Sequence, residues 1–131
     1  MKRLVLLVAL LLLGSGCASD PETQGATADC SSQVRVGDEV FTSYAFTRAQ
    51  ATRQGVADAA ECHDVGADPA GSVFPDDPRQ VRTWSFEGYS PDEVLGVRAG
   101  DDAFAVFIAE SVSATERDRI ADGLSNSGAG R

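Results

Sequence analysis

An apolar run near the start of the chain is the feature that most limits the fold. It indicates that the first residues are not part of the folded domain. Lys2 and Arg3 precede ten consecutive apolar residues at 4–13. Ten residues are too few for a membrane-spanning helix, which needs about 20, and are typical of the core of an export signal. Small residues occupy 14–16, where a signal peptidase would cut. We therefore expect residues 1–16 to be a cleaved signal peptide.

Cys17 follows Gly14, Ser15 and Gly16, an arrangement that is similar to the lipobox of bacterial lipoproteins. That resemblance implies cleavage before Cys17 and transfer of a diacylglyceryl group to its sulfur. The pattern departs from the usual lipobox, because Gly14 stands where leucine is common and Leu13 lies one position further back. An ordinary secretory signal with an incidental cysteine is the alternative. We predict lipid modification of Cys17, which anchors the protein to the extracytoplasmic face of the cell membrane; two acyl chains bind firmly where one binds marginally.

The segment after Cys17 contains no aromatic and no large aliphatic residue from 18 to 29. Such a composition cannot bury a core and is typical of a flexible linker. We therefore assign residues 17–29 to a lipid-anchored flexible tether. The folded domain is expected over residues 30–124, with a polar tail at 125–131.

The mature chain is strongly acidic, because loss of Lys2 and Arg3 changes the formal net charge from −9 to −11. This charge disfavours nucleic acid and anionic membrane surfaces as partners. It favours a cationic partner such as a basic protein. The alternative is that acidity only keeps an exported domain soluble.

Cys30 and Cys62 are the two cysteines that remain beside Cys17. In an exported chain they allow a single pairing, so we predict a disulfide between them. A loop of this size contributes about 3–4 kcal/mol on the loop-entropy model. A metal or redox site is disfavoured, since the chain has no Cys-x-x-Cys motif and His63 alone completes no ligand set. We expect neither a metal nor a cofactor.

Strand signals dominate the domain. Alternating residues on either side of Gly37 and Asp38 predict a hairpin over residues 32–46. Residues 80–86 alternate as a strand, and the wholly apolar residues 103–109 predict a central strand covered on both faces. Polar residues 47–55 indicate a short helix or a loop, and residues 67–78, with three prolines, indicate a loop.

Helix signals occur at two places. Ser90 and Pro91 can begin a helix of about one turn, which Gly96 would end. Ser113 and Glu116 form a capping box ahead of Ile120 and Leu124, which predicts a short C-terminal helix to about residue 124. The whole pattern predicts a mainly β domain: a single small antiparallel sheet or sandwich-like domain of about five strands, with a short C-terminal helix.

Several segments together carry a family resemblance. They are the strand opened by Cys30, GDEVFTSY at 37–44, GVADAAEC at 55–62 followed by Asp64, WSFEGYSP at 84–91, residues 94–97 and the apolar run 103–109. The chain thereby resembles a family of uncharacterised actinobacterial lipoproteins, a domain-of-unknown-function family. The resemblance implies fold and location and carries no activity.

Candidate catalytic groups are few. His63 and Asp64 beside Cys62 invite a catalytic interpretation, but no Gly-x-Ser-x-Gly nucleophile motif accompanies them. Three acidic pairs occur in turn-like segments: Asp76 and Asp77, Asp92 and Glu93, and Asp101 and Asp102. A glycosidase needs two carboxyl groups across a cleft, and calcium sites of the EF-hand type need a spacing that is absent here. We therefore assign no catalytic residue and no metal ligand.

Five aromatic residues offer an alternative binding face: Tyr44, Phe46, Trp84, Phe86 and Tyr89. Aromatic residues of strands are more often part of the core, which we predict for Trp84 and Phe86. Tyr89, beside a turn, is the one that we expect to be exposed.

These observations favour a non-enzymatic cell-envelope lipoprotein that displays a small acidic domain for binding or scaffolding. One alternative is an inhibitor of a basic cell-wall-directed enzyme such as a lysozyme. Another is a cell-wall hydrolase.

Overall fold

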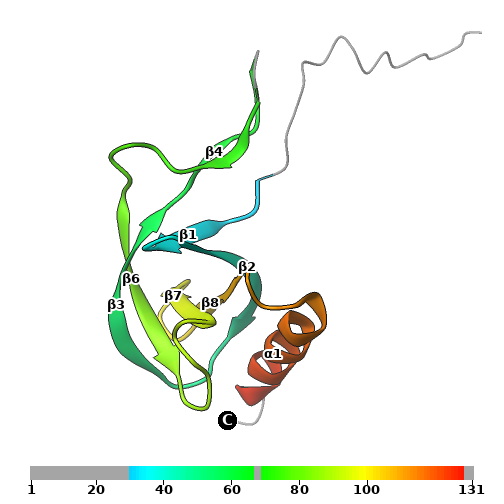
Figure 1. Cartoon of the computed structure of the whole chain (residues 1–131). Coiled ribbons are helices and arrows are strands. Elements are labelled where there is room, and N and C mark those ends of the chain that lie inside the picture. The colour runs from blue at the N-terminus through cyan, green and yellow to red at the C-terminus, as the bar shows by residue number, and fades with distance from the viewer. Residues whose placement is uncertain (1–29, 67–68, 129–131) are drawn as a thin grey trace, which may run out of the picture.

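The computed structural model of the chain describes residues 30–66 and 69–128 (Figure 1). The expected signal peptide, Cys17 and the tether to residue 29 lie outside the described residues, so those expectations stay predictions.

The described part is mainly β and contains eight strands and one helix. The strands are β1 (Gln33–Val36), β2 (Glu39–Thr47), β3 (Ala51–Ala59), β4 (Glu61–His63), β5 (Gly71–Val73), β6 (Gln80–Phe86), β7 (Val94–Arg98) and β8 (Phe104–Ala109), and the helix is α1 (Ala114–Ser127). Six strands form an antiparallel sheet in the order β1-β2-β8-β7-β6-β3, and pairing of β1 with β3 closes it into a barrel. Strands β4 and β5 form a separate ribbon. The predicted mainly β, antiparallel class is confirmed, with more strands than expected.

The first hairpin lies where the alternation places it. Strands β1 and β2 pair antiparallel from Gln33 opposite Thr42 to Val36 opposite Glu39. Gly37 in the turn has a φ of 59°, which glycine adopts without the strain that a Cβ would bring. The hairpin brings Val34 and Phe41 opposite each other in the core.

Strand β3 corrects the expectation of a short helix or loop over residues 47–55. Residues 52–56 are all exposed, so this half of the strand shows no apolar alternation in the sequence. Its hydrogen-bond partner is β6, paired with it from Ala51 opposite Phe86 to Asp58 opposite Gln80. The strand therefore forms because of a distant partner. Likewise, β5 lies within the segment expected to be a loop.

The segment after Ser90 is a turn and then a strand, which corrects the helix expected there. Ser90 does act as a cap, because its Oγ accepts from the backbone N–H of Asp92 at 3.3 Å and its carbonyl accepts from Glu93 and Val94. The chain then enters β7, where Val94 lies opposite Ile108 of β8. Gly96 is in the middle of this strand and ends no helix.

Strand β8 is the centre of the core, as its apolar sequence predicts. It lies between β2 and β7 in the sheet, and all its residues except Ala105 are buried. Of the buried apolar residues, all but Ala59 form one cluster with it: Val34, Phe41, Ala57, Phe86, Val94, Leu95, Phe104, Val106, Phe107, Ile108, Ala109, Val112, Ile120 and Leu124.

Helix α1 packs against β2 and β8 through Ile120 and Leu124. Ser113 is its N-cap and accepts a hydrogen bond from the backbone N–H of Glu116 at 3.3 Å, so the predicted cap is confirmed. The helix ends at Ser127, three residues beyond the expected end, so it includes residues expected in the polar tail. Across 30–66 and 69–128, no helix has the length and apolar character that crossing a membrane would take.

Candidate functional site

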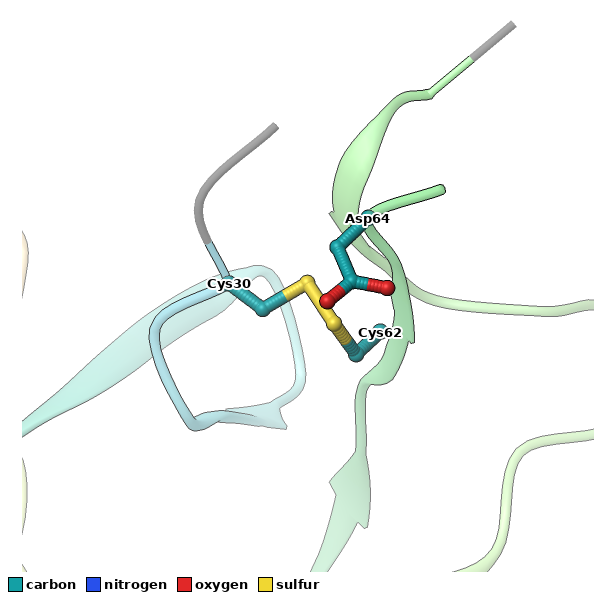
Figure 2. A group of neighbouring side chains, drawn as sticks. All are labelled: Cys30, Cys62 and Asp64. Atoms are coloured by element: carbon teal, nitrogen blue, oxygen red, sulfur yellow. A yellow bond between two sulfur atoms is a disulfide. The ribbon is translucent and has the colours of Figure 1, made fainter. Parts of the chain in front are cut away.

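A disulfide joins Cys30, the first described residue, to Cys62 in β4, with the two Cα atoms 5.6 Å apart (Figure 2). Beside it, the Ser72 hydroxyl of β5 donates to the carbonyl of Ser31 at 2.5 Å. Arg35 of β1 lies over the ring of Phe74, 4.5 Å from its centroid. The β4–β5 ribbon is thus fastened to the chain segment that leads into β1.

The same place holds a group of metal-ligand types. The sulfur atoms of Cys30 and Cys62 and a carboxylate oxygen of Asp64 lie within 4.8 Å of one another (Figure 2). Because the two sulfur atoms are bonded to each other, neither is a thiolate, and thiolates are what bind zinc. The oxidised group therefore offers a cation one exposed carboxylate.

His63 does not form the catalytic pair that its position next to Asp64 suggests. Its Nε2 lies 3.3 Å from Oε2 of Glu61, two residues away on the same strand. The side chains of both residues are more than half exposed. An exposed contact of this kind is worth little in free energy and supplies no oriented base.

The three acidic pairs lie in three different segments. Asp76 and Asp77 precede β6, Asp92 and Glu93 lie in the turn before β7, and Asp101 and Asp102 lie in the turn between β7 and β8. All six residues are exposed. Exposed acidic residues of turns are typical turn formers, and this arrangement provides no pair of carboxyl groups held across a cleft.

Glu116 of α1 forms an exposed ion pair with Arg119. The hydrogen bond and the negative charge of Glu116 raise the pKa of the Arg119 guanidinium above its usual value. Arg119 therefore stays protonated near neutral pH, and it contributes a positive charge but no acid or base.

Three buried or half-buried aromatic residues, Trp84, Phe86 and Phe104, form a group at one end of the sheet. The ring of Phe104 lies 5.4 Å from that of Trp84 and 6.0 Å from that of Phe86, centroid to centroid. The guanidinium of Arg98 covers both Trp84 and Phe104, at 5.2 and 5.1 Å from their centroids. The core prediction is correct for Phe86, and Trp84 packs against the core from a half-buried position.

Tyr89 is not the exposed aromatic residue. It is half-buried against the core, and its hydroxyl approaches α1 so closely that a Cβ at Gly123 would lie 2.8 Å away. The exposed aromatic residues are Tyr44, at 44%, and Phe46, at 67%. The Tyr44 hydroxyl accepts a hydrogen bond from Arg117 of α1 at 2.9 Å, so the aromatic side chain with the largest exposure is Phe46.

Phe46 borders a hollow of about 610 Å³ between the end of β2, the β7–β8 turn and the end of α1. Its lining residues are Phe46, Thr47, Arg48, Ala99, Ala103, Ser125 and Gly128. The sequence pattern placed Tyr44 and Phe46 on the same face as Thr42, but the pairing of β2 with β8 shifts between Ser43 and Ala45. This irregularity turns Phe46 outward, and no feature of the sequence marks it.

Comparison with known proteins gives a family and nothing else. The model of the family of unknown function DUF6281 matches residues 22–125. No curated protein and no solved structure matches the chain. The match extends past the apolar run 103–109, the last of the motifs that carry the resemblance, and includes most of α1.

Proposed function

This chain belongs to the DUF6281 family, whose function is unknown, and we propose that it is a non-enzymatic lipoprotein of the cell envelope. In this proposal Cys17 carries the lipid, residues 18–29 give reach, and the barrel is displayed for binding or scaffolding. The support for the anchor is the sequence at 2–17, with its basic start, apolar run and cysteine.

The observation that carries the proposal is the position of the disulfide. It fastens Cys30, where the proposed tether meets the fold, to β4. Figure 1 places β4 and the start of β1 at one end of the molecule and the last turn of α1 at the other. A tether that enters beside the disulfide would leave the opposite end, with the Phe46 hollow, free to meet other molecules.

The binding role follows from charge. The formal net charge of the chain is −9, and −11 without Lys2 and Arg3. A negative potential over the surface attracts cationic partners and speeds their association at low ionic strength. We therefore propose a basic protein of the envelope as the class of partner. Within residues 30–66 and 69–128, no particular site favours either the lysozyme-inhibitor alternative or the hydrolase alternative.

The lipid anchor is tested by the intact mass of the full chain extracted from membranes of a bacterial host. The expected mass is that of residues 17–131 plus a diacylglyceryl group and any N-terminal acyl chain. A Cys17→Ser variant, made in parallel, should lose the lipid and leave the membrane fraction. A mass that begins at Ala18 or later without lipid would contradict the proposal.

The binding role is tested by immobilising residues 18–131 with the disulfide intact. These residues contain every strand, the helix and the core of the described fold. Envelope extracts are passed over the domain at low salt and eluted with rising salt. The expected result is a basic protein that elutes as salt screens the attraction. Retention of acidic proteins alone, or of none, would count against the proposed partner.

A further inference from the structure

An exposed aromatic side chain and a hollow of mixed polar and apolar lining lie next to each other, at the end of the barrel away from the disulfide. Phe46 is 67% exposed. The hollow beside it, of about 610 Å³, has Ala99 and Ala103 in its lining. Aromatic residues and arginine are enriched in protein–protein interfaces relative to the rest of the surface, and here Phe46 and Arg48 line the same hollow.

Opposite charges border the same region. Arg48 lines this hollow and also an adjoining one of about 480 Å³, which Asp101 and Asp102 line. Among the described residues, Arg48, Asp101 and Asp102 form no ion pair within 4.0 Å. Arg98 also lines the adjoining hollow. Its guanidinium donates to the backbone carbonyl of Asp101 and not to the Asp101 carboxylate.

We call the surface formed by Phe46, Arg48, Asp101 and Asp102 the Phe46 patch. It combines a projecting aromatic side chain with a hollow, and a basic side chain with two acidic ones. A two-fold axis brings the same patch of two identical chains together, so that each residue i meets residue j and each j meets i. An isologous contact requires a self-complementary patch, which is what Phe46, Arg48 and the β7–β8 turn provide. A basic partner would complement the two aspartates but would meet Arg48 with like charge.

We propose that this patch binds a second copy of the chain in a two-fold symmetric dimer. Phe46 of each copy enters the hollow of the other, and Arg48 of each copy pairs with Asp101 and Asp102 of the other. This dimer is independent of the proposed lipoprotein role, because its formation requires neither the lipid nor a partner from the envelope.

The charge of the whole chain sets the salt dependence of this dimer. Two acidic molecules repel each other at long range, and the screening length falls from about 30 Å at 0.01 M salt to about 8 Å at 0.15 M. Moderate salt should therefore strengthen the dimer, because it screens the repulsion between the two acidic chains and leaves the contact of Phe46 unaffected. It also screens the pairs that Arg48 forms with the two aspartates, but exposed ion pairs contribute little free energy. A basic partner would respond in the opposite direction.

The test is sedimentation equilibrium of residues 18–131 over a range of micromolar concentrations, at low and moderate salt. The expected result is a monomer–dimer equilibrium that shifts towards the dimer at moderate salt. Phe46→Ser should weaken it about tenfold or more, since it removes a buried aromatic side chain from each half of the interface. Val65→Ser is the matched control, because Val65 is 73% exposed and lines neither hollow. The dissociation constant of its dimer should equal that of the wild type.

Charge reversal tests the pairing itself. Arg48→Asp and Asp101→Arg should each weaken the dimer, and the double variant should recover part of the loss. The substituted residues of both experiments, Phe46, Arg48, Val65 and Asp101, are all exposed, so circular dichroism melts should show that the variants are folded. A monomer at every concentration and salt would overturn the proposal. A dimer unaffected by Phe46→Ser, or a double variant no stronger than the weaker single variant, would overturn it too.

Discussion

The ring of Phe86 in β6 lies directly over the backbone of Gly96 in β7. A Cβ at residue 96 would come within 2.7 Å of Phe86 Cζ and 3.1 Å of Phe86 Cε2. Strands β6 and β7 share one paired position, Trp84 opposite Gly96. The ladder between these two strands is the shortest in the barrel, so the contact of this ring with this glycine adds packing where few backbone pairs hold the strands together.

Gly96→Ala should destabilise the protein by about 1–3 kcal/mol, the usual cost of forcing extra volume into a packed core. The free energy of unfolding is measured by urea denaturation. Gly100→Ala is the control, because a Cβ at residue 100 meets nothing within 4 Å. Equal stability of the two variants would show that Phe86 does not fill the space above Gly96.

Replacing both Cys30 and Cys62 by serine should lower the free energy of unfolding by about 3–4 kcal/mol. The disulfide closes a loop of sequence separation 32, and the loss is the restored conformational entropy of the unfolded chain. Urea denaturation of the double variant should match that of the wild type under reducing conditions. A wild type that is equally stable with and without reductant would contradict the expectation.

Thr47→Val should cost about 1–3 kcal/mol, because it leaves a buried acceptor without its donor. The Thr47 hydroxyl donates to the carbonyl of Leu124 at 2.6 Å. That carbonyl is in the last turn of α1, where carbonyls lack partners within the helix. Thermal melts compare the variant with Thr52→Val, an exposed threonine of β3, which should stay within about 0.5 kcal/mol of the wild type.

Ser113→Ala should cost about 0.5–2 kcal/mol through loss of the N-cap of α1. Ser113 accepts from the backbone N–H of Glu116. The helix content is followed by far-ultraviolet circular dichroism during urea titration. Ser125→Ala, at an exposed position inside the same helix, should leave the midpoint unchanged or slightly raised. A midpoint unchanged in the Ser113 variant would mean that the cap contributes nothing.

Local patterns succeeded where one short segment contains the whole signal. Gly37 and Asp38 between alternating runs predicted the first hairpin, and Ser113 with Glu116 predicted the start of α1. The saturated apolar run at 103–109 predicted β8, because a strand covered on both faces has no polar position to alternate with.

Local patterns failed where the structure depends on a distant partner. The exposed residues 52–56 show no apolar alternation and so give no strand signal, and their strand exists because β6 pairs with it. Ser90 caps the turn as its sequence suggests, but pairing of β7 with β8 carries the chain on as a strand. Phe46 was expected to face the same way as Thr42, and the irregular pairing of β2 with β8 turns it outward.

The amino-acid sequence by itself therefore determined the elements whose hydrogen bonds and apolar contacts are close along the chain: a hairpin, a covered central strand and a capped helix. The tertiary structure alone decided that six strands close into a barrel, that a polar segment becomes β3, and that Phe46 and Arg48 lie beside the β7–β8 turn. The physical reason is that these features depend on hydrogen bonds and packing between segments far apart in the chain, which no local pattern of residues records.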